Sequence, residues 1–280
     1  MITTPVALLV LLSALMHATW NYGLKASPDR LLDTVGMTLA GSLLAACLLP
    51  FVPLPAPASL PWMGLTLLVH VGYFLALVET YRHADLSIAY PLMRGMAPLL
   101  VAAAAPLLGE PLSPGLLAGV ALIGLGIMLP ACLGVARGTV SKAGVGYACA
   151  NAIIIALYTL SDGTGVRLSG NALSYTLWLY FLNAWAILAI ACWRRGNTVM
   201  SHLRRRWPTA LAGALLSIGS YGIVLWAMTL ASIPAVAALR ETSVIFAALL
   251  GAVLLRELMG RWRVAGALLV ALGAASIRWG

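Results

Sequence analysis

The chain has 280 residues, of which 62% are hydrophobic and only 9% are charged, and its mean hydropathy is +0.98. Soluble proteins carry about 25% charged residues, so a water-soluble surface is excluded, and so is a disordered chain, which needs more charge. The net charge of +9 does not indicate nucleic-acid binding, because the one run of basic residues, Arg204–Arg206, lies between apolar segments. The composition therefore predicts an integral membrane protein.

Ten apolar stretches follow one another along the chain, each ended by proline, glycine or charge. A helix needs about 20 apolar residues to cross a bilayer, and helices satisfy their backbone polar groups within the segment. We therefore expect an all-α polytopic membrane protein with ten transmembrane helices and no soluble domain. The predicted spans are 5–24, 32–52, 62–81, 87–108, 114–133, 144–163, 172–193, 209–230, 234–255 and 262–279.

The sequence contains an internal repeat with an offset of 147 residues. The segment Ala105–Glu110 (APLLGE) recurs as Ala252–Glu257 (AVLLRE), and the same offset carries Gly119 onto Gly266 and Gly126 onto Gly273. The repeat divides the chain into two five-helix units, 1–133 and 143–280. Because five is odd, the second unit enters the membrane inverted, and inverted repeats are typical of transporters with a binding site between the halves.

These motifs resemble a known family. Leu-Leu-Gly-Glu110-Pro-Leu followed by Gly119 and Gly126 resembles the end of an EamA repeat, and the segment around Glu257 and Gly266 resembles its second copy. The resemblance covers the whole chain and implies the ten-helix fold of the drug/metabolite transporter superfamily. The deep aromatic residues make the chain most similar to aromatic amino-acid exporters of the YddG type. We interpret Glu110 and Glu257 as turn and capping residues.

Basic residues are distributed unevenly between the two ends of the predicted spans. The connections that follow spans one, three, five, seven and nine hold thirteen Lys and Arg residues, whereas the opposite side holds only Arg167 and Arg278. By the positive-inside rule, both termini face away from the cytoplasm. The expected location is the bacterial cytoplasmic (inner) membrane, with multiple spans.

Two opposite charges lie deep in equivalent spans. Arg94 and Glu241 are each seven residues into their span, and the repeat offset maps one onto the other, so we expect them to meet near the membrane midplane. They form either an ion pair that clamps the two halves or a binding site in which Arg94 holds a substrate carboxylate. In the second case Glu241 faces an ammonium group or takes a proton. Arg240, one residue round the same helix, is the alternative carboxylate ligand.

Span four also carries Pro91 and Pro98 on one face. Each proline removes a backbone hydrogen bond and favours a kink, so we predict a gate here, with a purely structural bend as the alternative. Tyr90 and Met93 would then surround the freed carbonyl groups.

Polar and aromatic side chains form stripes on several other spans. His17, Trp20 and Asn21 share a face of span one, whereas His70 and Tyr73 share a face of span three, which also carries Glu79. Asn151, Tyr158 and Asp162 share a face of span six, with Asp162 close enough to the predicted end to face the membrane interface. In lipid such faces turn toward protein or water, and hydrogen bonds between helices are the alternative to a pathway role. Gly115–Gly119 and the Ala267, Ala271 and Ala275 series predict close helix packing, within the fold or between subunits.

The sequence thus favours a secondary transporter that exports small zwitterionic metabolites by alternating access. Aromatic amino acids are the substrates that it favours most. The alternatives are a carrier of other metabolites or cationic drugs, a membrane receptor or assembly subunit, and an intramembrane enzyme, for which no catalytic motif was found. We expect no cofactor, metal or nucleic acid; the partners are a small-molecule substrate and lipid, and proton coupling is an open option. The predicted gating residues are Pro91 and Pro98, and the predicted substrate-binding residues are His17, Trp20, Asn21, Glu79, Tyr90, Met93, Arg94, Tyr158, Trp178, Tyr221, Arg240 and Glu241.

Overall fold

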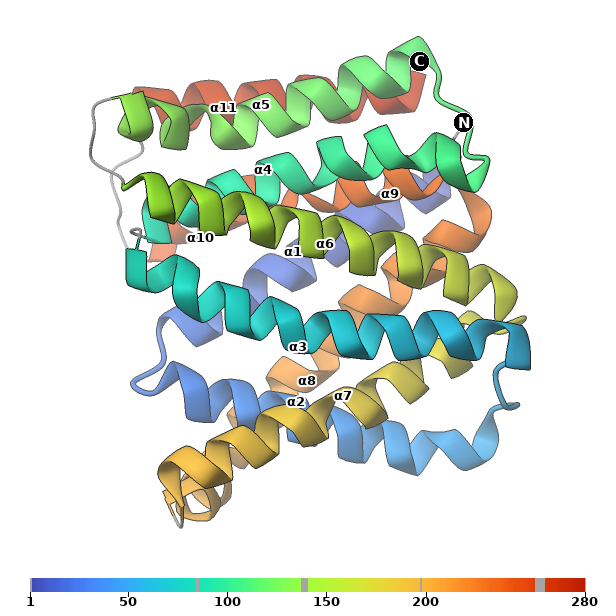
Figure 1. Cartoon of the computed structure of the whole chain (residues 1–280), viewed down its shortest axis with the longest axis vertical. Helices are drawn as coiled ribbons and strands as arrows, with labels where there is room; N and C mark the ends of the chain where they lie inside the picture. The colour runs from blue at the N-terminus through green and yellow to red at the C-terminus, as the bar shows by residue number, and fades with distance from the viewer. Residues whose placement is uncertain (1, 84–85, 137–140, 197, 255–259, 280) are drawn as a thin grey trace.

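A computed structural model describes residues 2–83, 86–136, 141–196, 198–254 and 260–279, and its regular elements in these ranges are all helices. Arg137, Arg256 and Glu257, which the sequence analysis used, lie outside the described residues. The α-helices are α1 (Thr4–Lys25), α2 (Arg30–Leu48), α3 (Leu60–His83), α4 (Leu86–Ala104), α5 (Pro114–Ala136), α6 (Lys142–Leu168), α7 (Ala172–Arg195), α8 (Thr198–Leu230), α9 (Ile233–Arg240), α10 (Ser243–Leu254) and α11 (Arg261–Trp279) (Figure 1).

Within the described ranges, eight segments are long and apolar enough to cross a membrane. They comprise α1, α2, α4, α5, α6, α7, α8, and α9 together with α10. The predicted spans 62–81 and 262–279 are also helical, as α3 and α11, but neither is among the eight, and several side chains of α3 lie outside the described residues. The chain is therefore a multi-span membrane protein, and the crossing of α3 and α11 stays a prediction.

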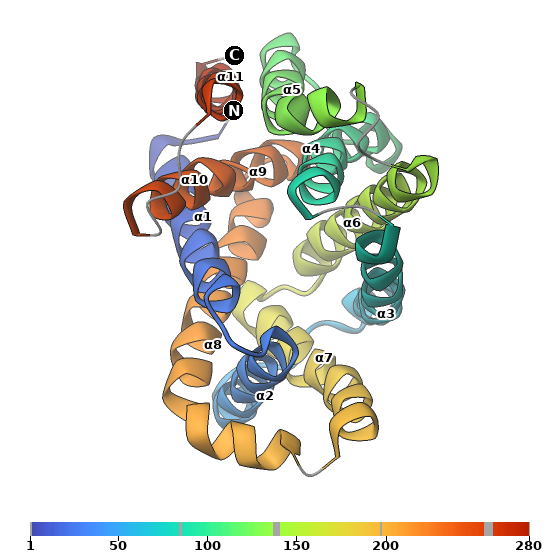
Figure 2. The same ribbon diagram turned by 90° about the vertical axis from the view of Figure 1, so that its left-hand side faces the viewer.

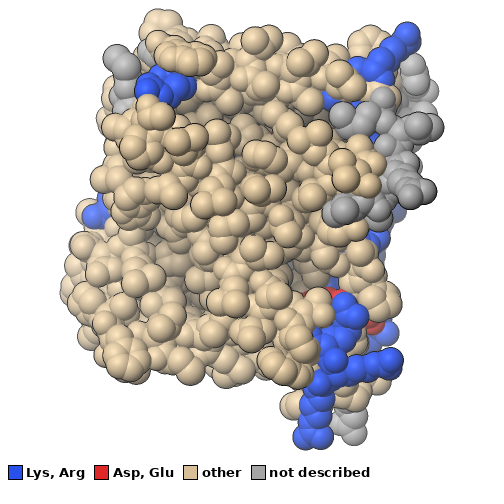
Figure 3. Space-filling model, turned by 180° about the vertical axis from the view of Figure 1, so that it is seen from behind, with Lys and Arg blue, Asp and Glu red and all other residues tan. Residues whose placement is uncertain are grey.

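The connections between helices lie alternately at two opposite ends of the bundle (Figure 1). Both chain ends lie at one of them, where Arg278 Nη2 is 2.5 Å from Thr4 Oγ1. At the same end the α2–α3 connection meets the α6–α7 connection, because Ala56 N donates to Ser169 O over 3.0 Å. Viewed from behind, the body between the two ends is almost free of charge, and most basic side chains gather at the end away from the termini (Figure 3).

Helices α5 and α11 pack more closely than side chains would allow. A Cβ atom added to Gly119 would lie 2.7 Å from the carbonyl oxygen of Gly273, and one added to Gly126 would lie 2.7 Å from that of Gly266. The two helices therefore run antiparallel with their backbones in contact. The close packing predicted for Gly119 is confirmed within one chain, whereas Ala271 of the alanine series is exposed.

The helix is interrupted in predicted span nine, and the kink predicted for span four stays a prediction. Helix α4 continues through both Pro91 and Pro98, whereas predicted span nine is broken into α9 and α10 at Glu241 and Thr242. Around this break the amides of Val244 and Ile245 donate to carbonyls three residues earlier, as in a tight turn. The break places Glu241 at the end of a buried helix.

Candidate functional site

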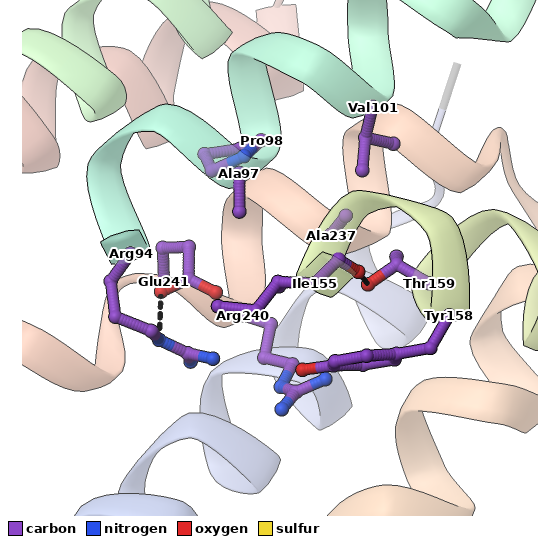
Figure 4. Close-up of a pocket in the computed structure, with 10 residues that line it drawn as sticks. All are labelled: Arg94, Ala97, Pro98, Val101, Ile155, Tyr158, Thr159, Ala237, Arg240 and Glu241. Atoms are coloured by element: carbon purple, nitrogen blue, oxygen red, sulfur yellow. Dashed lines mark hydrogen bonds and ion pairs between the residues drawn. The ribbon is translucent and has the colours of Figure 1, made fainter. Parts of the chain in front are cut away.

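Three helices converge on the buried charges. Helix α4 presents Arg94, Ala97, Pro98 and Val101; α6 presents Ile155, Tyr158 and Thr159; and α9 presents Ala237, Arg240 and Glu241 (Figure 4). In each helix these residues recur at spacings of three and four, so one face of each helix turns inward.

The predicted meeting of Arg94 and Glu241 is confirmed. Arg94 Nε lies 3.0 Å from Glu241 Oε2, and the two side chains are 8% and 6% exposed. The atoms are close without being aligned for a hydrogen bond, so Arg94 Nε, Arg94 Nη2 and Glu241 Oε2 have no hydrogen-bond partner among the described residues. The pair therefore retains hydrogen-bonding capacity that the protein itself does not use.

Arg240 is the second buried arginine, and it has no carboxylate partner among the described residues. Its guanidinium lies 5.4 Å from the centre of the Tyr221 ring, its Nε has no hydrogen-bond partner in the described chain, and it is 8% exposed. Figure 4 shows Arg240 lining the same small cavity as Arg94 and Tyr158. A buried cation without a counter-ion is costly, which makes Arg240 the more available anion ligand of the two.

Aromatic and histidine rings adjoin these charges. The Tyr158 ring centre is 4.6 Å from that of His70 and 6.2 Å from that of Tyr73. On α1, His17 packs edge-on against Trp20 at 4.9 Å. The faces and edges of these aromatic side chains can pack against a flat ring of a bound molecule.

The other predicted site residues have partners of their own. Glu79 is bonded to Arg82 near the end of α3, 2.7 Å away, and does not join the Arg94–Glu241 pair. The Asn21 amide donates a hydrogen bond to the backbone of its own helix. The Met93 side chain is 1% exposed, and its sulfur accepts a hydrogen bond from the Asn151 amide over 2.9 Å. Trp178 packs edge-on against Phe181. Tyr90 is partly buried next to Arg94.

Asp162 is placed differently from its prediction. Instead of facing the interface, it is 1% exposed inside α6. Its carboxylate accepts hydrogen bonds from the hydroxyl groups of Tyr221 and Tyr175, the latter over 3.3 Å. Gly165 makes room for the Tyr175 hydroxyl, because a Cβ there would collide with it. Two tyrosines from α7 and α8 therefore hold a carboxylate in the protein interior.

The space beside the Arg94–Glu241 pair is too small for a substrate. The ten lining residues enclose a cavity of about 10 Å³, room for about one water molecule. A substrate as large as an amino acid needs α4, α6 and α9 to separate.

A second cavity, of about 600 Å³, lies at the end that holds the termini. Its charged groups already have partners: Arg167 is bonded to Glu110 and to the carbonyls of Met228 and Ala231. Glu110 also accepts from the Ile233 amide at the start of α9, over 3.3 Å. Glu110 thus caps α9, a helix remote in sequence, while Arg167 links α6 to α8.

Comparison with known proteins agrees with this architecture. Residues 142–279 match the EamA-like transporter family. A crystal structure of a protein shares the fold with a TM-score of 0.73 at 21% identity, covering 98% of this chain and 98% of the other. No curated protein matches the chain by sequence.

Proposed function

We propose that the protein is a secondary transporter of small zwitterionic metabolites, because residues 142–279 match the EamA-like transporter family. Aromatic amino acids are the substrates we favour, exported across the bacterial cytoplasmic membrane by alternating access between two inverted five-helix repeats. The observation that carries the proposal is the cluster of buried, incompletely bonded charges at Arg94, Arg240 and Glu241.

Contacts between the halves support the inverted arrangement. Gly119 meets Gly273 and Gly126 meets Gly266. Under the offset of 147, the first contact becomes the second, as a two-fold axis in the membrane plane requires. The Arg94–Glu241 pair maps onto itself. A site on such an axis is accessible in turn to both sides when the halves rock.

Each part of the substrate has a matching group. Arg240 binds the carboxylate, because Arg94 already has Glu241 as its partner and an arginine fork suits a carboxylate. Glu241 accepts the ammonium group through Oε2, which has no hydrogen bond within the described chain. The rings of Trp20, Tyr90, Tyr158, Trp178 and Tyr221 provide apolar walls for the substrate ring, and His17 lines the approach. Asp162 and Glu241 are buried carboxylates available for proton coupling.

The test is transport by the purified protein in liposomes, using labelled phenylalanine and its decarboxylated amine, phenylethylamine. We expect exchange of phenylalanine across the membrane to be lost in Arg240→Met and partly kept in Arg240→Lys, which retains the charge without the fork. Arg82→Met, at an exposed position on α3, is the matched control. An acid-inside or acid-outside pH gradient that accelerates uptake would establish proton coupling.

Two results would contradict the proposal. Phenylalanine exchange at the wild-type rate in folded Arg240→Met would exclude Arg240 as the carboxylate ligand. Transport of the amine with none of any amino acid would favour the cationic-drug alternative instead.

A further inference from the structure

A separate feature of the molecule is the basic end of helices α7 and α8. Helix α8 changes direction at Arg206, whose torsion angles are not helical (φ −114°, ψ 18°). Figure 2, which looks onto this end, shows the first segment of α8 lying across the other helices before the chain turns into the bundle. Residues Thr198–Arg206 therefore run across the direction of the helices in the bundle.

The inner side of this segment is fixed to α2. Val199 is 3% exposed and belongs to a small core with Leu32 and Val35. Asp33 accepts hydrogen bonds from His202 Nε2 over 2.7 Å and from Arg206 Nε over 2.8 Å. One buried carboxylate thus neutralises the inward-facing basic groups and holds the segment in place.

The outer side carries charge that the protein does not neutralise. Arg194, Arg195, Arg204 and Arg205 are all exposed, and the nearest carboxylate recorded for any of them in the described ranges is Asp29, 3.8 Å from Arg195. Trp193 and Trp207, 84% and 61% exposed, flank the set. In Figure 3 the basic side chains at the lower end project beyond the body of the protein.

We propose that these four arginines form a binding surface for the phosphate groups of anionic phospholipids. Exposed tryptophans are typical of residues at headgroup level, so the arginines between them lie at the depth of the lipid phosphates. Arginine binds phosphate through two parallel hydrogen bonds, and basic residues at this depth are attracted to an anionic leaflet. Because Asp33 holds the segment rigidly, the arginines are positioned before lipid arrives, which lowers the entropic cost of binding. The surface is independent of the transport site.

The experiment compares the thermal stability of the purified full-length protein in detergent with added phosphatidylglycerol or phosphatidylcholine. We expect phosphatidylglycerol to raise the unfolding temperature of the wild type more than phosphatidylcholine does, and added salt to weaken this difference. The double variant Arg204→Gln, Arg205→Gln should lose most of it. Arg82→Gln, which removes an exposed arginine at the same end of the molecule, should keep it. Inorganic phosphate at the same concentration should have no effect if the lipid headgroup at the membrane surface is the ligand.

Asp33→Asn provides a second, independent measurement. It leaves all four arginines in the chain but weakens the attachment of the segment to α2, so the preference for phosphatidylglycerol should fall although the basic residues are unchanged. Equal stabilisation by both lipids, or an undiminished preference in the double arginine variant, would overturn the proposal. Stabilisation by inorganic phosphate alone would show a free-anion site and would overturn it as well.

Discussion

The ion pair between Arg94 and Glu241 gives the most quantitative prediction. Both side chains are more than nine-tenths buried and their charged atoms are 3.0 Å apart. Removing one partner of a buried pair leaves an uncompensated charge, which costs about 3–5 kcal/mol. Because this pair lacks aligned hydrogen bonds, we expect the lower end, about 3 kcal/mol, for Arg94→Met and for Glu241→Gln alone.

The double variant Arg94→Met, Glu241→Gln removes both charges and should recover most of the lost stability. The assay is a thermal-stability scan of the two single variants, the double variant and the wild type in the same detergent. Transport is measured in parallel: the double variant should still carry amino acids poorly, because the ammonium ligand is gone.

One outcome would refute this reasoning. If the two single effects simply add in the double variant, Arg94 and Glu241 do not stabilise each other. Wild-type phenylalanine transport by Arg94→Met would, in addition, show that Arg94 has no role in the site.

Three further predictions concern helix packing, gating and membrane topology. Gly126→Ala should destabilise the protein by about 1–3 kcal/mol, because its Cβ would lie 2.7 Å from a carbonyl oxygen of α11; Gly64→Ala, with open space around it, is the control, and similar stability of both would contradict the close packing. If α4 moves as a gate, Pro91→Ala or Pro98→Ala should slow transport while leaving substrate binding intact; unchanged transport in both would make the prolines structural only. Both termini should lie outside the cytoplasm, so a C-terminal alkaline phosphatase fusion should be active and a green-fluorescent-protein fusion dark, and the reverse pattern would contradict the basic-residue count.

Hydropathy was sufficient to locate helical segments along the chain, because a membrane-spanning segment can be recognised from its apolar composition alone. The internal repeat added one contact between distant residues: an offset of 147 predicts that Arg94 and Glu241 lie at equal depth, and the ion pair confirms that they meet. Both inferences depend on local pattern or on symmetry. Neither requires knowledge of how the helices pack.

The burial of Asp162 and the position of the helix break depend on how the helices pack, which the sequence could not predict. Asp162 looked like an interfacial residue because it is near the end of its apolar stretch, but α6 continues to Leu168 and brings it under Tyr175 and Tyr221. The break at Glu241 has no glycine or proline at the broken position, whereas α4 tolerates two prolines. A helix in the membrane can keep or lose its regular hydrogen bonds according to its neighbours, and one sequence does not reveal those neighbours.

The contact between α5 and α11 also bears on how the chain is assembled. Its glycine faces belong to helices separated by most of the second half of the sequence, so α5 enters the bilayer long before its partner is synthesised. Until then its glycine face is in contact with lipid. Small apolar residues are stable in that environment, so the helix can stay in the membrane without its partner. Docking of α11, the last described helix, is therefore a late step in biogenesis, and it joins the two halves by contact between backbones. A defect at Gly119 or Gly126 should leave insertion of the early helices intact and appear only in the final closure of the bundle.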